Sequence, residues 1–324
     1  MRKDLLERLP LVCPGCRRPG KVARPNIRLA SITKSSGKFI IKGKLKCTDC
    51  GRKYEINGGV VCIIDRKRAS RFVSKETVSS YLHASYGFYP RRGKIAAFGG
   101  NEELWGKLRK EFGAESENLP SIDLGCGMGR STFELAKKSS VAVGLDADFQ
   151  ALLLAAKFSR TGKIEYDLKI RGLAKIPVKS GFLPSNDAAF VLADARAPPF
   201  PKESFRIVCA CNLIDSIGSP SELLRKMDSL LIPGGTLVVA SPFSWREEVT
   251  ARKQWLETKE LEGIDYLSKV LRGRLLPGLG LRYSITGKER GIEWSFWTGR
   301  MHVNTFFTDI LSARKSMRRF SSPP

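Results

Sequence analysis

From Ser121 onward, short apolar runs alternate with segments in which apolar residues recur every three or four positions. The short runs are typical of buried strands, and the longer period is typical of helices that pack through one face. Regular alternation of the two predicts an α/β fold, a mostly parallel sheet with flanking crossover helices. The expected strands are 121–125, 141–146, 188–194, 206–212 and 236–241, and the expected helices are 130–138, 148–160 and 220–231.

The N-terminal part has a different pattern, in which apolar and polar residues alternate between glycine turns. The runs at 38–47 and 54–64 have a period near two, which is typical of strands. We therefore expect a small β-rich domain over residues 1–65.

The remaining boundaries follow from changes in composition. Residues 66–120 are expected to form a polar connector followed by N-terminal helices, and residues 121–324 are expected to form the α/β domain. An insertion at 161–188 contains several basic residues and no clear period. It is compatible with a hairpin or cap near an active site and also with a plain surface loop.

The length of 324 residues and a hydrophobic content of 42% suit two soluble domains with real cores. No apolar run approaches the roughly 20 residues that span a bilayer. The opening MRKDLLERLP carries charges where a signal peptide needs an apolar core. We therefore expect a cytoplasmic protein that has no membrane partner.

The net charge of +24 is concentrated near the N-terminus. Residues 1–71 hold 19 Lys and Arg against 5 Asp and Glu. Such a basic segment attracts polyanions, so nucleic acid is a candidate partner. A solvated Lys- and Arg-rich surface explains the same composition.

Four of the eight cysteines form two CxxC pairs, Cys13 with Cys16 and Cys47 with Cys50. This spacing lets two tight turns present four thiolates tetrahedrally to Zn²⁺. A redox dithiol would not need the matched second pair, so the sequence predicts a structural zinc site. A domain this small has little core, and metal binding is expected to decide whether it folds.

The arrangement LPLVCPGC followed by LKCTDCGRKYEINGGVVCII resembles the zinc-ribbon activator subunits that partner tRNA, rRNA and release-factor methyltransferases. The resemblance covers most of residues 1–65. It implies a zinc ribbon that is fused to its enzyme.

The stretch SIDLGCGMGR closes a predicted strand and opens a predicted helix. Its glycines, Gly125, Gly127 and Gly129, let the backbone approach a ligand, and the helix N-terminus offers unpaired N–H groups to a carboxylate. Three acidic residues lie close to the ends of predicted strands, and a small residue follows the last of them. These residues are Asp123, Asp146 and Asp194, followed by Ala195.

A nicotinamide-binding domain also has a glycine turn and an acidic residue at the end of its second strand. Its fingerprint is GxGxxG, whereas this sequence reads GCGMGR, with Arg130 in place of the third glycine. The spacing therefore argues against nicotinamide binding.

The ordered motifs DLGCGMG, LDAD, ADARAPPF, RIVCACNLIDSI and IPGGTLVVAS resemble those of class I methyltransferases. Members of that class have a Rossmann-like fold and use S-adenosylmethionine (SAM) as the methyl donor. The resemblance covers residues 121–245, and it implies a SAM-dependent methyltransferase.

The same resemblance implies roles for individual residues. The three glycines would line the methionine and ribose part of SAM, and Asp146 would bind the ribose hydroxyls. Asp194 and Ala195 would contact the adenine, and Asn212 would lie beside the sulfonium. Asp123 would either contact the SAM amine, directly or through water, or order the loop.

The methyl acceptor is marked less clearly. A sulfonium is already an activated electrophile, so methyl transfer mainly needs an aligned acceptor lone pair and implies no obligatory general base. Candidate catalytic residues are Asn212, Tyr86 and His83, and a histidine base would be His83 or His302. Further candidates for the acceptor pocket are Tyr81, Tyr89, Asp215, Trp245, Glu247, Glu248, Trp294, Trp297 and Arg300.

Three functional interpretations follow. The element SPFSWREE, with NLIDSIGSP before it, looks like the methyltransferases that act on mercaptohistidine, which implies a small-molecule acceptor. The basic ribbon instead favours RNA or a translation-associated protein as acceptor. A noncatalytic nucleic-acid- or protein-binding module is the third interpretation, and the intact glycine loop with Asp146 argues against it.

Overall fold

The computed structural model describes residues 1–18, 22–69, 77–87, 101–113, 119–171, 174–298 and 303–317. Three acceptor candidates, Tyr89, Arg300 and His302, lie outside these residues. The α-helices are α1 (Lys3–Arg8), α2 (Val78–Tyr86), α3 (Glu102–Glu111), α4 (Arg130–Leu135), α5 (Phe149–Thr161), α6 (Pro220–Leu230) and α7 (Gly263–Leu271). The strands are β1 (Ile27–Ser36), β2 (Phe39–Cys47), β3 (Lys53–Asn57), β4 (Val60–Cys62), β5 (Ser121–Leu124), β6 (Ala142–Asp146), β7 (Glu165–Arg171), β8 (Ala174–Lys179), β9 (Ala188–Leu192), β10 (Phe205–Cys211), β11 (Leu231–Ser241), β12 (Tyr283–Trp297) and β13 (Val303–Lys315).

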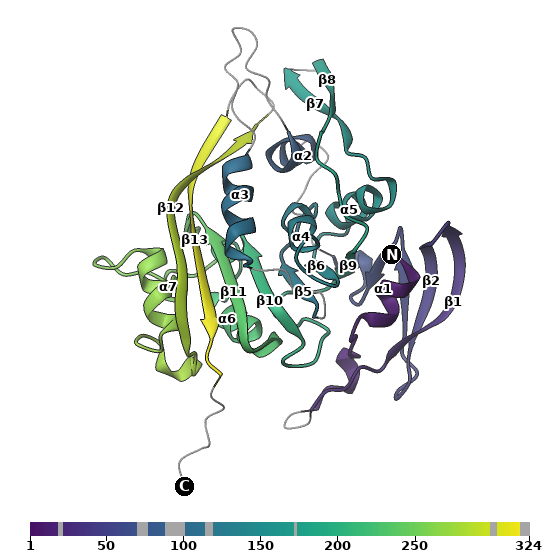
Figure 1. Ribbon diagram of the computed structural model, residues 1–324, viewed down its shortest axis with the longest axis horizontal. Helices are drawn as coiled ribbons and strands as arrows, with labels where there is room; N and C mark the ends of the chain where they lie inside the picture. The colour runs from purple at the N-terminus through teal and green to yellow at the C-terminus, as the bar shows by residue number, and fades with distance from the viewer. Residues whose placement is uncertain are drawn as a thin grey trace.

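Eleven of these strands form one sheet in the order β1-β2-β3-β4-β9-β6-β5-β10-β11-β13-β12 (Figure 1). The central block from β4 to β11 is parallel, and the strands at both ends pair antiparallel. The expected parallel α/β arrangement is therefore confirmed in this central block, which lies within a larger mixed sheet. Chain order reverses direction between β5 and β10, and in open α/β sheets ligands bind beyond the carboxyl ends of strands at such a point.

Helices cover both faces of the sheet, and each face has its own apolar core. One core contains residues from α1, α6 and α7, such as Leu5, Leu223 and Leu267. The other contains residues from α2 to α5, such as Leu104 and Phe133. Strand β9 is buried at every position because its side chains reach both cores. This explains its continuous apolar sequence.

Helix α5 shows how local sequence sets an element's limits. The Asp148 side chain accepts hydrogen bonds from the backbone N–H groups of Gln150 and Ala151, at 2.9 and 3.1 Å. Gly162 ends the helix with φ +66°, a left-handed conformation that glycine adopts without strain. These caps place the helix within a residue of its predicted range.

The structure also contains strands outside the ranges expected from the sequence pattern, among them β1, β12 and β13. Beyond Ile27, no residue of strand β1 is buried, so its side chains do not alternate between a buried and an exposed face. It forms through backbone pairing with β2. The long strands β12 and β13 pair with each other and extend the sheet beyond β11.

The N-terminal strands are continuous with the main sheet. Val61 and Cys62 of β4 pair in parallel with Val191 and Leu192 of β9. The basic insertion forms a separate antiparallel hairpin, β7 with β8. Among the described residues, no helix is both long and apolar enough to cross a membrane.

Candidate functional site

A cavity of about 630 Å³ lies beyond the carboxyl ends of the parallel strands. The segments that follow β5, β6, β9 and β10 all contribute to its wall. It therefore occupies the place where the strand order predicts a ligand. Of the residues expected to bind SAM, Gly125, Gly127, Asp146, Asp194, Ala195 and Asn212 line this cavity.

The three glycines of the loop after β5 have different structural roles. A Cβ on Gly125 would lie 2.8 Å from the Leu213 side chain, and one on Gly129 would lie 3.0 Å from the Ala155 and Phe190 side chains. A Cβ on Gly127, which has φ +51°, would meet nothing within 4 Å. Gly127 thus leaves open space on the cavity wall, which a bound ligand can use. Gly129 instead allows close packing beneath the loop.

Asp146 ends β6 and holds the loop from the side. Its carboxylate accepts the backbone N–H groups of Gly127 at 2.8 Å and Asp148 at 2.7 Å. Burial raises the pKa of this carboxyl above its usual value, and the hydrogen bonds from Asp148 and Gly127 oppose that shift. A carboxylate has more acceptor sites than these two bonds use, so Asp146 can still accept from ligand hydroxyls.

Asp123 lies beneath the loop and is fully buried. Its carboxylate accepts the hydroxyls of Ser131 at 2.5 Å and Thr132 at 2.8 Å, both in the first turn of α4. It is not among the residues that line the cavity. Of the two roles considered for it, ordering the loop fits this placement, and direct contact with a cavity ligand does not.

Asp123 gives a prediction for pH dependence. Burial raises its pKa from 3.8 to about 6 in the folded protein. Between these values the folded protein binds the proton more tightly than the unfolded chain, so this group's contribution to stability falls as pH rises. The loss should reach about 3 kcal/mol at neutral pH.

Urea unfolding of the wild type and Asp123→Asn, at about pH 4 and about pH 7, measures this contribution. We expect the variant to gain about 2.5 kcal/mol relative to the wild type between the two pH values, because a small part of the loss has already occurred at about pH 4. Asp187→Asn, which changes a more exposed carboxylate, provides the control. Parallel pH profiles for Asp123→Asn and the wild type would contradict the assignment.

Asp194 and Ala195 follow β9 at another side of the cavity. Arg196 holds the Asp194 carboxylate through its backbone N–H at 2.8 Å and its guanidinium at 2.8 Å. Burial alone would raise the pKa of Asp194, but these bonds lower it below the usual value. Asp194 is therefore held ionised and oriented.

Asn212 directly follows β10 and has an uncommon backbone conformation. Its φ is +52°, which is uncommon for a residue with a side chain. Its backbone N–H donates to Ala240 O at 2.8 Å. Its buried Oδ1 has no partner in the described part of the chain, and neither does the Nε1 of Trp105. Buried polar atoms usually have partners, so both atoms suggest a ligand at this cavity.

Part of the cavity wall is aromatic. Tyr81 and Trp294, which the sequence suggested, line it together with Trp105 and Phe306, which the sequence did not reveal. Arg246 and the buried Asp215 also contribute to the wall. Asp215 accepts the backbone N–H of Ser244 at 2.9 Å.

The other acceptor candidates lie elsewhere. The Tyr86 hydroxyl donates to Met128 O at 2.6 Å, and His83 Nδ1 lies 2.8 Å from the Tyr166 hydroxyl. Burial lowers the pKa of His83 to about 4. Neither residue lines the cavity, and the same holds for Trp245, Glu247, Glu248 and Trp297. Tyr86 therefore contacts the cavity wall through Met128, and His83 contacts Tyr166 of β7.

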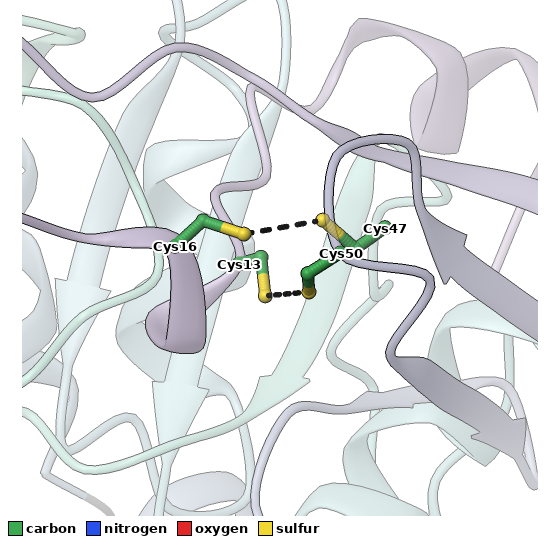
Figure 2. A group of neighbouring side chains, drawn as sticks. All are labelled: Cys13, Cys16, Cys47 and Cys50. Atoms are coloured by element: carbon green, nitrogen blue, oxygen red, sulfur yellow. Dashed lines mark hydrogen bonds between the residues drawn. The ribbon is translucent and has the colours of Figure 1, made fainter.

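The four cysteines of the two CxxC pairs lie close together, with their sulfur atoms facing one another (Figure 2). Their sulfur atoms all lie within 4.8 Å of one another. Cys13 and Cys50 approach to 3.7 Å, and Cys16 and Cys47 approach to 3.6 Å. Tetrahedral zinc with Zn–S bonds of about 2.3 Å needs sulfurs about 3.8 Å apart. The cluster therefore fits a metal ion with four thiolate ligands.

Part of the chain is similar to known methyltransferases. Residues 122–239 match the family model described as "Methyltransferase domain". A ubiquinone/menaquinone biosynthesis C-methyltransferase of Shewanella baltica is 23% identical over 61% of this chain and 76% of its own length. A ubiquinone biosynthesis O-methyltransferase of Caulobacter is 28% identical over 39% of this chain and 41% of its own length.

A solved SAM-dependent methyltransferase from Methanosarcina mazei aligns with 63% of this chain and 95% of its own, at 19% identity and a TM-score of 0.42. The family match contains Gly125 and Gly127 of the glycine loop, Asp146 and Asn212, all of which line the cavity. The protein is a SAM-dependent methyltransferase.

Proposed function

We propose that the protein transfers the methyl group of SAM to a small-molecule acceptor that binds against the aromatic part of the cavity wall. One observation carries this proposal. A single cavity joins the glycine loop and Asp146 to four aromatic side chains: Tyr81, Trp105, Trp294 and Phe306. Apolar and aromatic lining with a few polar groups is typical of small-molecule sites.

The residues around the loop fit SAM. Gly127 leaves space for the methionine and ribose portion, and Asp146 has acceptor capacity for ribose hydroxyls. Asp194 and Ala195 would border the adenine, and Asn212 would lie beside the sulfonium, where its buried Oδ1 needs a partner. When bound, SAM supplies an electrophilic methyl group. The residues that line the cavity orient the acceptor and exclude water, and Asp146 holds the glycine loop.

The relatives support a small acceptor. The Shewanella and Caulobacter proteins are named for quinone biosynthesis, so their acceptors are small molecules. An RNA or translation-associated protein acceptor is the alternative, and the charge of residues 1–71 favours it. The two acceptor classes differ in which cellular fraction becomes methylated.

Labelled SAM, incubated with the protein and a fractionated lysate, tests the acceptor class. We expect label in the small-molecule pool. Phe306→Ala should reduce that transfer about tenfold with SAM affinity unchanged, since it removes part of the acceptor wall. Phe307→Ala is the matched control, because Phe307 is 62% exposed and does not line the cavity. Label in RNA or protein instead, or equal effects of both variants, would contradict the proposal.

We further propose that Cys13, Cys16, Cys47 and Cys50 hold a structural Zn²⁺. Four thiolates fill a tetrahedral shell, which leaves no open position for catalysis. Neighbouring groups order the ligands. Asn26 accepts the backbone N–H of Cys13 at 2.7 Å, and the Tyr54 hydroxyl lies 2.9 Å from the Cys13 sulfur.

A further inference from the structure

One face of the strands β1, β2 and β3 carries six exposed basic side chains. We call this set the basic face: Arg28, Lys34, Lys42, Lys44, Lys46 and Lys53. Although the residues come from three strands, the pairing register brings them together. We propose that the basic face binds the phosphate backbone of single-stranded RNA.

The register arranges the charges in rows across the sheet. Arg28 pairs with Lys46, which pairs with Lys53 on the other side. Lys34 pairs with Lys42 two rows away. Paired residues share a face, and alternate residues on one strand lie about 6.7 Å apart. The six charges therefore form one grid in which neighbouring backbone positions are closer than the Debye length of about 8 Å at physiological ionic strength.

No carboxylate in the described part of the chain forms an ion pair with this grid. None of the six side chains forms an ion pair there. The carboxylate within the grid, Glu55, pairs with Arg66. Like charges directly opposite each other destabilise a sheet. A surface that only needed solubility would mix both signs. An anionic partner removes this repulsion.

The form of the face favours a nucleic-acid strand. Its opposite side packs into the core through Leu45 and Ile56, so the exposed side is an open sheet surface. It offers no helix to enter a groove, and Tyr54, the aromatic residue of β3, directs its hydroxyl to Cys13. Contacts would therefore be to phosphates, which give affinity without reading sequence. Evenly spaced lysines suit the repeating charges of an extended strand.

Two neutral side chains within the grid favour RNA over DNA. Ser31 pairs with Lys44, and Asn57 pairs with Lys42. A hydroxyl and an amide beside the lysines can hydrogen-bond to ribose 2′-hydroxyls, the groups that distinguish RNA from DNA. The inference does not rest on the proposed methyl acceptor, because the basic face shares no residue with the cavity.

Salt-dependent binding tests the inference. Fluorescence anisotropy of the full chain with a labelled oligouridylate should give a plot of log K against log salt with a slope of about −4, since each phosphate contact on a single strand contributes about −0.7. In Lys42→Gln/Lys44→Gln/Lys46→Gln the slope should fall to about −2, and affinity at low salt should fall at least about tenfold. SAM affinity should be unchanged, which shows that the variant folds.

A matched variant separates the basic face from overall charge. Lys202→Gln/Lys253→Gln/Lys259→Gln removes the same charge from exposed positions elsewhere and should retain the wild-type slope. The oligomer of the same length made as deoxyuridylate should bind more weakly than RNA, and so should vesicles of phosphatidylserine and phosphatidylcholine. Equal losses in both variants, equal binding of DNA, or tighter binding of vesicles would each overturn the inference.

Discussion

Replacing Asp146 with alanine is expected to abolish measurable SAM binding. The carboxylate lines the cavity and accepts the backbone N–H groups of Gly127 and Asp148. The variant would lose the bonds to the ribose hydroxyls, each contributing about 1.5 to 3 kcal/mol, and would also release Gly127. Two such bonds correspond to a loss of about 100-fold or more in affinity.

Isothermal titration with SAM measures this loss. Asp146→Asn keeps a neutral acceptor for Gly127, so we expect it to bind more tightly than Asp146→Ala and less tightly than the wild type. Asp187→Ala, at a carboxylate that does not line the cavity, should leave the affinity unchanged. Wild-type affinity in Asp146→Ala would remove Asp146 from the proposed site.

Replacing Cys47 with serine is expected to release zinc and unfold the N-terminal strands. The Cys47 side chain is fully buried, and its sulfur lies 3.6 Å from that of Cys16. Zinc binding in small finger peptides contributes roughly 10 to 16 kcal/mol, which is comparable to the whole stability of a typical domain. Metal content should fall from one zinc per chain to none.

Hydrogen exchange shows how far the unfolding extends. Protection should be lost over residues 1–65 and retained in β5, β6 and β10, because those strands also pack against helices α4 and α6, which lie outside that region. Cys62→Ser is the matched control, since Cys62 is a buried cysteine of β4 outside the cluster. A metal-free protein with a protected N-terminal region would refute the zinc assignment.

Some residues of the cavity were predictable from their neighbours in the sequence, and others were not. The glycine loop and Asp146 were predictable, because a strand end, a tight turn and a helix start lie next to one another in the chain. Trp105 and Phe306 had no such signal. They reach the same wall from α3 and β13, far apart in sequence, and nothing in their immediate neighbours distinguishes them from core aromatics.

Asp123 shows the limit of reasoning from strand position. Its place two residues before Gly125 was compatible with either SAM contact or loop support. Side chains alternate between the two faces of a strand, but which buried partner each one meets depends on the helix packed above it. Here Ser131 and Thr132 of α4 take the carboxylate.

By itself the sequence determined the α/β order, the glycine loop with its acidic neighbours, and the pairing of cysteines into two knuckles, since each depends on residues close together in the chain. Only the tertiary structure decided that β4 joins β9, that aromatic residues from separate elements enclose the cavity, and that Arg28, Lys34 and Lys53 lie beside the lysines of β2. The physical reason is that strand register and side-chain packing are set by contacts between distant segments, which hydrophobic periodicity along the chain does not encode.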